Sequence, residues 1–424
     1  MNTVLTIEGA TSTGANYLTW SPLRASIRLV DAGGVAGPVA VTMRNRGAAQ
    51  AGRVVFFEAV PGTEEDELPL LLPTNGTAVE FFVAGKFGRP SLADKDAIIE
   101  AVQTSSGTVL SRTPVMVRIR KNANNLTVGE RNRFLSALAA LNNSGMGRFS
   151  DFRNMHRSAA QDEGHGLPGF LPWHRAYLLD LERELQQIDP SVALPYWRFD
   201  QPAGRVFTQA FMGVPGPNDR LMFSPSNPLQ SWTTDQVQGI IRRPRFTATT
   251  QAANNQGRPV RNENLTLRLG GTANLYSDFS FNLEDNPHGA AHVCFDGYLR
   301  SIGNAPRDPL FFLLHANVDR LWAKWQWTRL RFDAANPATY HLQGSAGSPG
   351  AERIGHNLND TMWPWNQDMT LPRPSTAPGG NFPTSAVAPA PTPTPAVREM
   401  IDHQGIIAAG NRLGFDYDDV RFEP

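Results

Sequence analysis

Residues 169–197 read GFLPWHRAYLLDLERELQQIDPSVALPYW, and the part from Pro172 to Ile188 predicts a long helix. Pro172 suits the first helical turn, where its missing N–H costs nothing. From His174 onward, apolar residues recur at steps of three and four: Tyr177, Leu178, Leu181, Leu185 and Ile188. This spacing is typical of one buried helical face. A histidine at the head of the stripe therefore points into the protein core.

His174 belongs to a larger pattern, because two triplets contain six of the nine histidines: His156, His165 and His174, then His288, His292 and His315. His288 and His292 are four residues apart and follow Asn286-Pro287, a cap residue and a first-turn proline. They therefore project from one helical face.

The histidine triplets indicate metal ligands. A lone histidine on an apolar face is more often a packed core residue than a ligand, but six in two groups favour ligands. Neutral imidazole binds copper, zinc, iron and nickel. With no thiolate near them, the triplets indicate two adjacent metal ions in a nitrogen shell, and zinc stays open at this point. Asp319, one turn after His315, is a candidate carboxylate for orienting a ligand.

Several stretches resemble the tyrosinase and polyphenol oxidase family. Residues 169–197 are similar to its copper A region, and residues 283–292 (LEDNPHGAAH) and 308–326 (DPLFFLLHANVDRLWAKWQ) to its copper B region. Weaker likenesses are found at residues 126–142, 359–366 (NDTMWPWN) and 413–418 (LGFDYD).

The resemblance implies a dinuclear type 3 copper centre on a four-helix bundle. The six histidines would hold two copper ions, with dioxygen bound side-on as co-substrate and phenols oxidised to quinones. Leu314-His315 stands where the family often has two histidines, and His315 matches the ligand. Glu163 replaces a cysteine that some relatives crosslink to the second copper A histidine. We interpret Cys294, the only cysteine, as a packing residue.

Four further residues are expected at the substrate pocket, Glu284 as its catalytic carboxylate and Gly289, Val293 and Ile302 as lining residues. Glu284 matches a carboxylate that holds an active-site water in plant polyphenol oxidases, although an acid favoured by a helix N-terminus is an equal reading. Gly289 and Val293 follow the first two copper B histidines, where side chains influence monophenol against diphenol use. Ile302 lies near a gating position of some relatives.

Three functions follow from the resemblance. The leading one is a tyrosinase or catechol oxidase that converts o-diphenols to o-quinones and hydroxylates monophenols. The second is a haemocyanin-like dioxygen carrier, and the third is an o-aminophenol oxidase. The expected partners are small phenolic molecules, and the sequence says nothing about the oligomeric state.

The composition suits an ordinary globular enzyme. The 424 residues contain 39 Lys and Arg and 39 Asp and Glu, so no net charge favours nucleic acid or anionic lipid. No apolar run approaches the length of a membrane helix, and the first residues lack a secretory signal pattern. The cytoplasm is the default location, and export stays open.

The chain is expected to be multidomain, with α and β parts. Short alternating segments before residue 122 predict an antiparallel β-sandwich over residues 1–122, able to shield the active site. Residues 123–345 are expected to form the mainly helical, tyrosinase-like domain with the dicopper site, including a short helix at Thr234 to Ile241. Residues 346–424 read as a proline-rich strap, a short helix at Val397 to Gln404 and a closing aromatic motif, packed on the copper domain.

Overall fold

The computed structural model describes residues 1–8, 16–32, 34–158, 163–268, 274–340, 355–370, 375–385 and 387–424. The chain forms two compact units. The first, here called the β unit, contains residues 1–119, 385–389 and 404–424. The second, the helical unit, contains residues 120–384 and 390–403.

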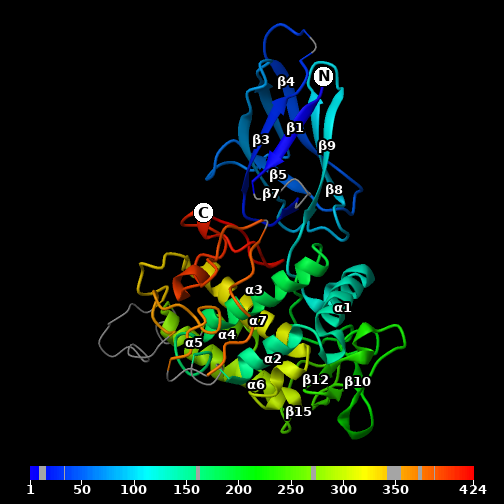
Figure 1. Ribbon diagram of the computed structural model, residues 1–424, viewed down its shortest axis with the longest axis vertical. Coiled ribbons are helices and arrows are strands. Elements are labelled where there is room, and N and C mark those ends of the chain that lie inside the picture. The colour runs from blue at the N-terminus through cyan, green and yellow to red at the C-terminus, as the bar shows by residue number, and fades with distance from the viewer. Residues whose placement is uncertain are drawn as a thin grey trace. The chain divides into compact units, whose positions relative to one another are not determined.

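The β unit contains two sheets (Figure 1). One has the strand order β1-β3-β7-β5 and the other β2-β9-β8-β4-β6. Their bounds are β1 Thr3–Ile7, β2 Tyr17–Leu18, β3 Leu23–Leu29, β4 Val39–Arg46, β5 Val54–Phe57, β6 Glu67–Leu72, β7 Val79–Gly85, β8 Ala97–Gln103 and β9 Val109–Val117. The paired strands are antiparallel apart from β2 and β9.

The two sheets pack against each other around one apolar core. Residues of β3 alternate between buried and more exposed positions, so one face of the strand points into this core. Ile27 from the first sheet and Val41 and Val115 from the second are all fully buried in the same cluster. The sheets therefore form the sandwich that the alternating sequence predicts.

The closing aromatic motif differs from expectation, because residues 404–424 belong to the β unit. Asp416 accepts a hydrogen bond from the backbone N–H of Trp20 at 2.8 Å, and the Trp20 indole donates to the carbonyl of Tyr417 at 2.8 Å. Phe422 packs against the β core. The prediction that this motif packs on the copper domain is wrong for these residues, since an apolar motif does not reveal which core it completes.

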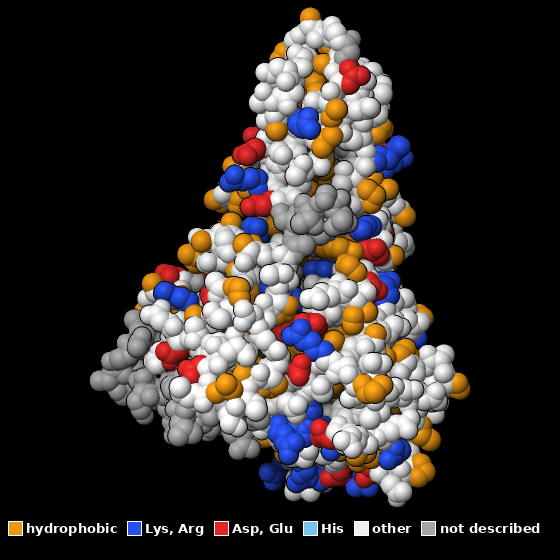
Figure 2. Space-filling model, in the orientation of Figure 1, with side chains coloured by type: hydrophobic (Ala, Val, Ile, Leu, Met, Phe, Trp, Pro, Cys, Tyr) orange, Lys and Arg blue, Asp and Glu red, His pale blue; other side chains and the backbone are white. Residues whose placement is uncertain are grey.

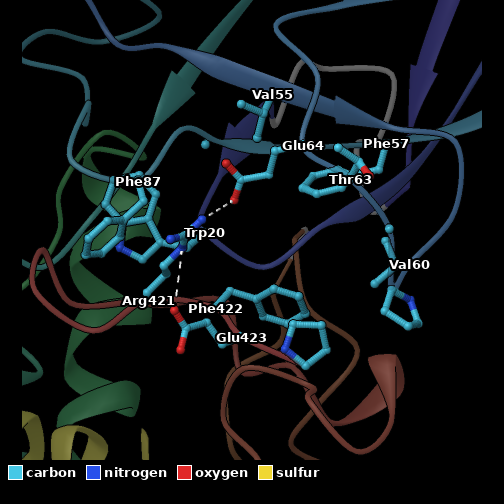
Figure 3. Close-up of a pocket in the computed structure, with 14 residues that line it drawn as sticks. Trp20, Val55, Phe57, Val60, Thr63, Glu64, Phe87, Arg421, Phe422 and Glu423 are labelled. Atoms are coloured by element: carbon cyan, nitrogen blue, oxygen red, sulfur yellow. Dashed lines mark hydrogen bonds and ion pairs between the residues drawn. The ribbon is translucent and has the colours of Figure 1, made fainter. Parts of the chain in front are cut away.

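A cavity of about 540 Å³ in the β unit is lined partly by the same C-terminal residues. Figure 3 shows Arg421 and Phe422 beside Trp20 and Phe87, with Arg421 paired to Glu64 at 3.0 Å. The last residues of the chain are thus built into the β unit.

The helical unit contains the two histidine triplets. Its α-helices are α1 Val128–Asn142, α2 Phe149–Ser158, α3 Phe170–Ile188, α4 Glu263–Thr266, α5 Tyr276–Leu283, α6 Ala290–His292 and α7 Leu310–Arg329. A π-helical turn, η5, spans Glu284–Gly289. Helix α3 packs against both α1 and α7. The helical core agrees with the expected architecture, and the four-helix count of the bundle stays a prediction.

Short elements complete the fold. The remaining strands are β10 Val214–Pro215, β11 Leu221–Met222, β12 Thr233–Thr234, β13 Val237–Gln238, β14 Arg242–Pro244 and β15 Phe295–Gly297. The 3₁₀ turns are η1 Ala123–Asn125, η2 Asn143–Gly145, η3 Pro217–Asp219, η4 Pro228–Ser231, η6 Tyr298–Arg300, η7 Ala305–Arg307, η8 Val397–Met400 and, in the β unit, η9 Ala409–Asn411.

Two details of the sequence reading are wrong. The helix expected at Thr234 to Ile241 is the hairpin β12–β13, whose turn residues Asp235 and Gln236 both have positive φ. Ile188, at the end of α3, is 45% exposed. The rest of α3 is buried on nearly all sides, and even Arg175 and Glu182 are buried. The helix is therefore more deeply buried than one apolar face would predict.

The surface is of mixed charge. On the face that Figure 2 shows, acidic and basic side chains lie interspersed, in keeping with the equal numbers of the two in the sequence. Within the part of the chain that the structure describes, no helix has the length and apolar character needed to cross a membrane.

Candidate metal centre

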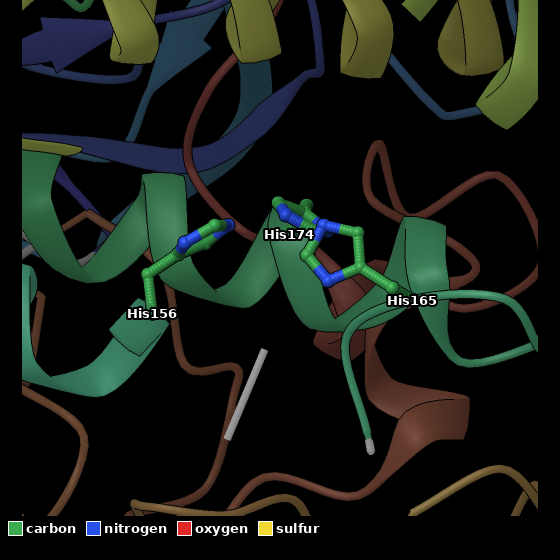
Figure 4. Close-up of side chains that lie close together, drawn as sticks. All are labelled: His156, His165 and His174. Atoms are coloured by element: carbon green, nitrogen blue, oxygen red, sulfur yellow. The ribbon is translucent and has the colours of Figure 1, made fainter. Parts of the chain in front are cut away.

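The structure brings each sequence-predicted histidine triplet together. In each triplet, one ring nitrogen from every histidine lies within 4.8 Å of the others. In the first triplet, His156 lies on α2, His174 on α3 and His165 on the irregular segment between them. Figure 4 shows the three rings gathered from two helices and a loop.

The second triplet is contributed by three elements, with His288 on η5, His292 on α6 and His315 on α7. The backbone of Asn286 is extended and interrupts the helical path, so the run that carries His288 and His292 starts at Pro287. The Nε2 atoms of these two histidines lie 3.3 and 3.2 Å from Nε2 of His315 on α7. With the predicted spacing of four residues, the rings of His288 and His292 both point toward the ring of His315.

Backbone carbonyls fix the orientation of three of the rings. The Nδ1 atoms of His174, His288 and His292 each lie 2.8 Å from a carbonyl oxygen, belonging to Phe170, Glu284 and Leu299 in turn. A carbonyl only accepts, so each Nδ1 carries the proton and each Nε2 presents its lone pair. Lone pairs that converge in this way suit a cation placed between them.

Burial keeps these imidazoles neutral. It lowers the pKa of His156, His174, His288 and His315 well below the usual value, and that of His292 to about 4. Neighbouring histidines lower the pKa values further. Metal binding requires the unprotonated ring, so the site is ready to bind at neutral pH.

The two triplets face each other. The rings of His174 and His315, one from each triplet, are stacked with their centroids 4.3 Å apart and an interplanar angle of 9°. Phe311 lies between the triplets as well, 4.7 Å from the ring of His156 and 4.2 Å from that of His315. Two metal ions held here would be neighbours in a site walled by apolar rings.

A cavity of about 720 Å³ opens onto the histidines. All four residues predicted for the substrate pocket line it: Glu284, Gly289, Val293 and Ile302. Val293 and Ile302 are 41% and 52% exposed and lie toward its outer part. The sequence reading gave no pocket role to Asp285, Asn286 and Arg300, which also line the cavity. Asp285 and Asn286 lie within the copper B stretch 283–292, whereas no motif marks Arg300.

Glu284 and Asp285 both line this cavity, and Glu284 is the one that the sequence predicts to be catalytic. Burial raises the pKa of Glu284 to about 7, and the backbone N–H of Gly166, which donates to Oε1 at 2.7 Å, opposes that rise. A carboxyl group in this range exchanges protons readily near neutral pH.

Asp319 pairs with two buried arginines. It accepts from Arg175 on α3 at 2.6 Å and from Arg120 at 3.2 Å. Arg175 adjoins His174, and Asp319 lies four residues after His315. The carboxylate therefore ties together the two helices that bear the stacked histidines, and that it orients a ligand ring stays a prediction.

The remaining candidates are placed as follows. The Cys294 thiol donates to the carbonyl of Ala290 at 3.1 Å, and burial raises its pKa to about 12, which agrees with a packing role. His356 and His403 lie outside both triplets, and His341 lies outside the described residues. Among the described residues, the two triplets are the groups that could hold a metal ion.

The chain is similar in sequence to proteins of the tyrosinase family. Residues 146–328 match the family model described as the common central domain of tyrosinase. The tyrosinase of Streptomyces glaucescens is 36% identical over 274 residues, covering 58% of this chain and 92% of that protein. The grixazone synthase of Streptomyces griseus is 30% identical over 305 residues, covering 59% and 94%. A functional unit of Octopus haemocyanin aligns with a TM-score of 0.47 at 20% identity, covering 72% of this chain and 69% of that one.

Proposed function

The chain belongs to the tyrosinase family of copper oxidoreductases, and from this premise we propose that it is a phenol oxidase converting o-diphenols to o-quinones with dioxygen. Hydroxylation of monophenols is the second activity of the proposal. The observation that carries it is the pair of facing histidine triplets beneath a cavity of about 720 Å³, which has room for a phenol.

The residues fit two copper ions. Borderline imidazole nitrogen is a suitable ligand for copper in both of its oxidation states. The first ion would be held by His156, His165 and His174, and the second by His288, His292 and His315. Three of these rings already present Nε2, because their Nδ1 atoms are bonded to carbonyls.

When bound, the copper pair supplies the redox chemistry, taking up dioxygen and exchanging electrons with a phenol beside it. The chain supplies the rest. The cavity walls hold the aromatic ring, and Val293 and Ile302 offer it apolar contact. Phe311, which is fully buried, forms an apolar wall against His156 and His315.

Glu284 is the proposed base for the phenol hydroxyl. A phenol is a weak acid, so its proton must be removed as it binds. Gly166 holds one oxygen of the carboxylate, and the other can take up the proton directly or through a water. Gly289 lies at the same cavity and has no side chain to orient such a water, so diphenols are expected to react faster than monophenols.

Catechol, tyrosine and o-aminophenol, each added to copper-loaded protein, test this proposal. Rapid colour with catechol and slower colour with tyrosine after a lag is the expected result. Colour with o-aminophenol alone would replace the proposal by the aminophenol oxidase. A reversible absorption change on adding dioxygen, with no turnover of any of the three, would identify a carrier.

A further inference from the structure

One candidate ligand differs from the other five in how its backbone is held. His156, His174, His288, His292 and His315 all lie on helical segments, whose own hydrogen bonds fix the backbone. His165 lies in residues 163–169, which form no helix or strand. Contacts from elsewhere in the chain must therefore fix the position of His165.

A later segment, residues 355–363, contacts the start of this loop. Glu163, two residues before His165, is only 4% exposed, and its Oε2 accepts from the backbone N–H of Trp363 at 3.2 Å. A methyl group on Gly355 would come within 2.5 Å of the same oxygen. Gly355 also has a φ of +85°, which favours glycine. The carboxylate is thus seated directly on this segment.

The same segment also contacts the end of the loop. The backbone N–H of Gly169, just before α3, donates to Nδ1 of His356 at 3.1 Å. His356 is fully buried, and its carbonyl accepts from the hydroxyl of Tyr340 at 2.9 Å. The loop that carries His165 is therefore held at both ends.

Trp363 extends the contact to the third member of the triplet. The backbone N–H of Trp363 donates to Glu163, while its backbone carbonyl accepts a hydrogen bond from the indole N–H of Trp173 at 2.8 Å. Trp173 precedes His174 on α3. The backbone of Trp363 therefore links the loop that carries His165 to the helix that carries His174.

Residues 355–363 have their own internal support. Oδ2 of Asp360 accepts from the backbone N–H groups of Gly355 at 3.0 Å and Asn357 at 3.1 Å. This closes a turn over residues 355–360, which contains His356. A preformed turn can position the segment that packs on it, because the turn itself loses little further conformational entropy in that contact.

We infer that residues 355–363 form a clamp that positions His165 for metal binding, with Glu163 and His356 as its positioning residues. The inference rests on the proposed function, because it takes the first triplet as a copper site. Partners that orient a ligand from outside the metal's own shell typically change metal affinity by about 10- to 100-fold.

Copper retention in the full chain tests the clamp. Glu163→Ala removes the acceptor, whereas Glu163→Gln keeps an oxygen for the N–H of Trp363. Each copper-loaded protein is titrated with a chelator, and the copper left per chain is measured. We expect Glu163→Ala to release one of its two coppers at about 10- to 100-fold lower chelator concentration than the wild type. Glu163→Gln should behave like the wild type.

Asp96→Ala is the matched control. Asp96, in the β unit, is also a carboxylate that accepts backbone N–H bonds, from Gly52 at 3.1 Å and Leu92 at 2.9 Å. Its loss should lower the thermal midpoint of the metal-free protein and leave both coppers in place. A purely structural role for Glu163 would give the same pattern as this control.

The possible outcomes separate the two proposals. Wild-type protein that holds fewer than two coppers contradicts the proposed site itself. Wild-type protein with two coppers and a Glu163→Ala variant that releases both at unchanged chelator concentration overturns the clamp. If Glu163→Ala does not fold, His356→Ala decides in the same assay, with His356→Asn as the variant that retains an acceptor.

Discussion

The two histidine triplets are supported in different ways. In the second, the rings of His288 and His292 are held by carbonyls only four and seven residues away in sequence. In the first, the loop with His165 is held by groups 118, 187 and 200 residues away. A site with local support is readable from sequence spacing, whereas one with distant support depends on the completed fold.

The largest expected effect comes from removing a ligand in either triplet. His174→Ala and His292→Ala should each lose one copper, and catechol oxidation should fall by more than the roughly 100-fold seen for outer partners of a metal. The unfolding midpoint of the metal-free protein should change far less, because the helices keep their apolar packing. Metal analysis, turnover and thermal unfolding check this, and a variant that keeps two coppers would remove that histidine from the ligand set.

Asp319 is expected to affect both triplets at once, because its ion pair with Arg175 joins α3 to α7. Asp319→Asn weakens the pairing of two fully buried arginines and should cost about 3 kcal/mol of unfolding free energy. Copper retention should then weaken similarly in both triplets. Denaturant unfolding measures the first effect and chelator titration the second.

Asp296→Asn is the control for Asp319. Asp296 also pairs with several arginines, including Arg243 and Arg245, but its side chain is 27% exposed. Surface pairs contribute only about 0 to 1 kcal/mol. Equal destabilisation by both substitutions would contradict the role given to Asp319.

Smaller effects are expected at the cavity of the second triplet. Gly289 has helical angles, and a Cβ there would lie 3.3 Å from the carbonyl of Glu284, so a side chain needs only a small shift. Gly289→Asn should raise the ratio of monophenol to diphenol turnover several-fold, since one hydrogen bond to a water is worth about 1 kcal/mol. Glu284→Gln should lower that ratio.

Steady-state rates on tyrosine and catechol give this ratio. A Gly289→Asn protein with full copper and an unchanged ratio would show that position 289 has no part in orienting a water.

Much of the second triplet could be predicted from the sequence. The spacing of His288 and His292 after a proline sets both rings on one face. The copper B motif marks Glu284 and Gly289, and the family resemblance beyond it adds Val293 and Ile302. The stripe in α3 likewise predicts that His174 points inward. These inferences depend on residues close together in the chain, where helix geometry fixes directions.

Contacts between residues far apart in the chain could not be predicted from the sequence. Nothing near Glu163 shows that it meets Trp363, and nothing in residues 413–418 shows that they complete the β core rather than the helical one. For the same reason, that residues 1–122 shield the pocket stays a prediction.

Metal analysis of the copper-loaded wild-type protein is the most direct test of the central claim. The two facing triplets predict two copper ions per chain, together with an absorption band that appears when dioxygen is added to the reduced protein. One copper per chain, or zinc at both triplets after purification, would contradict the account.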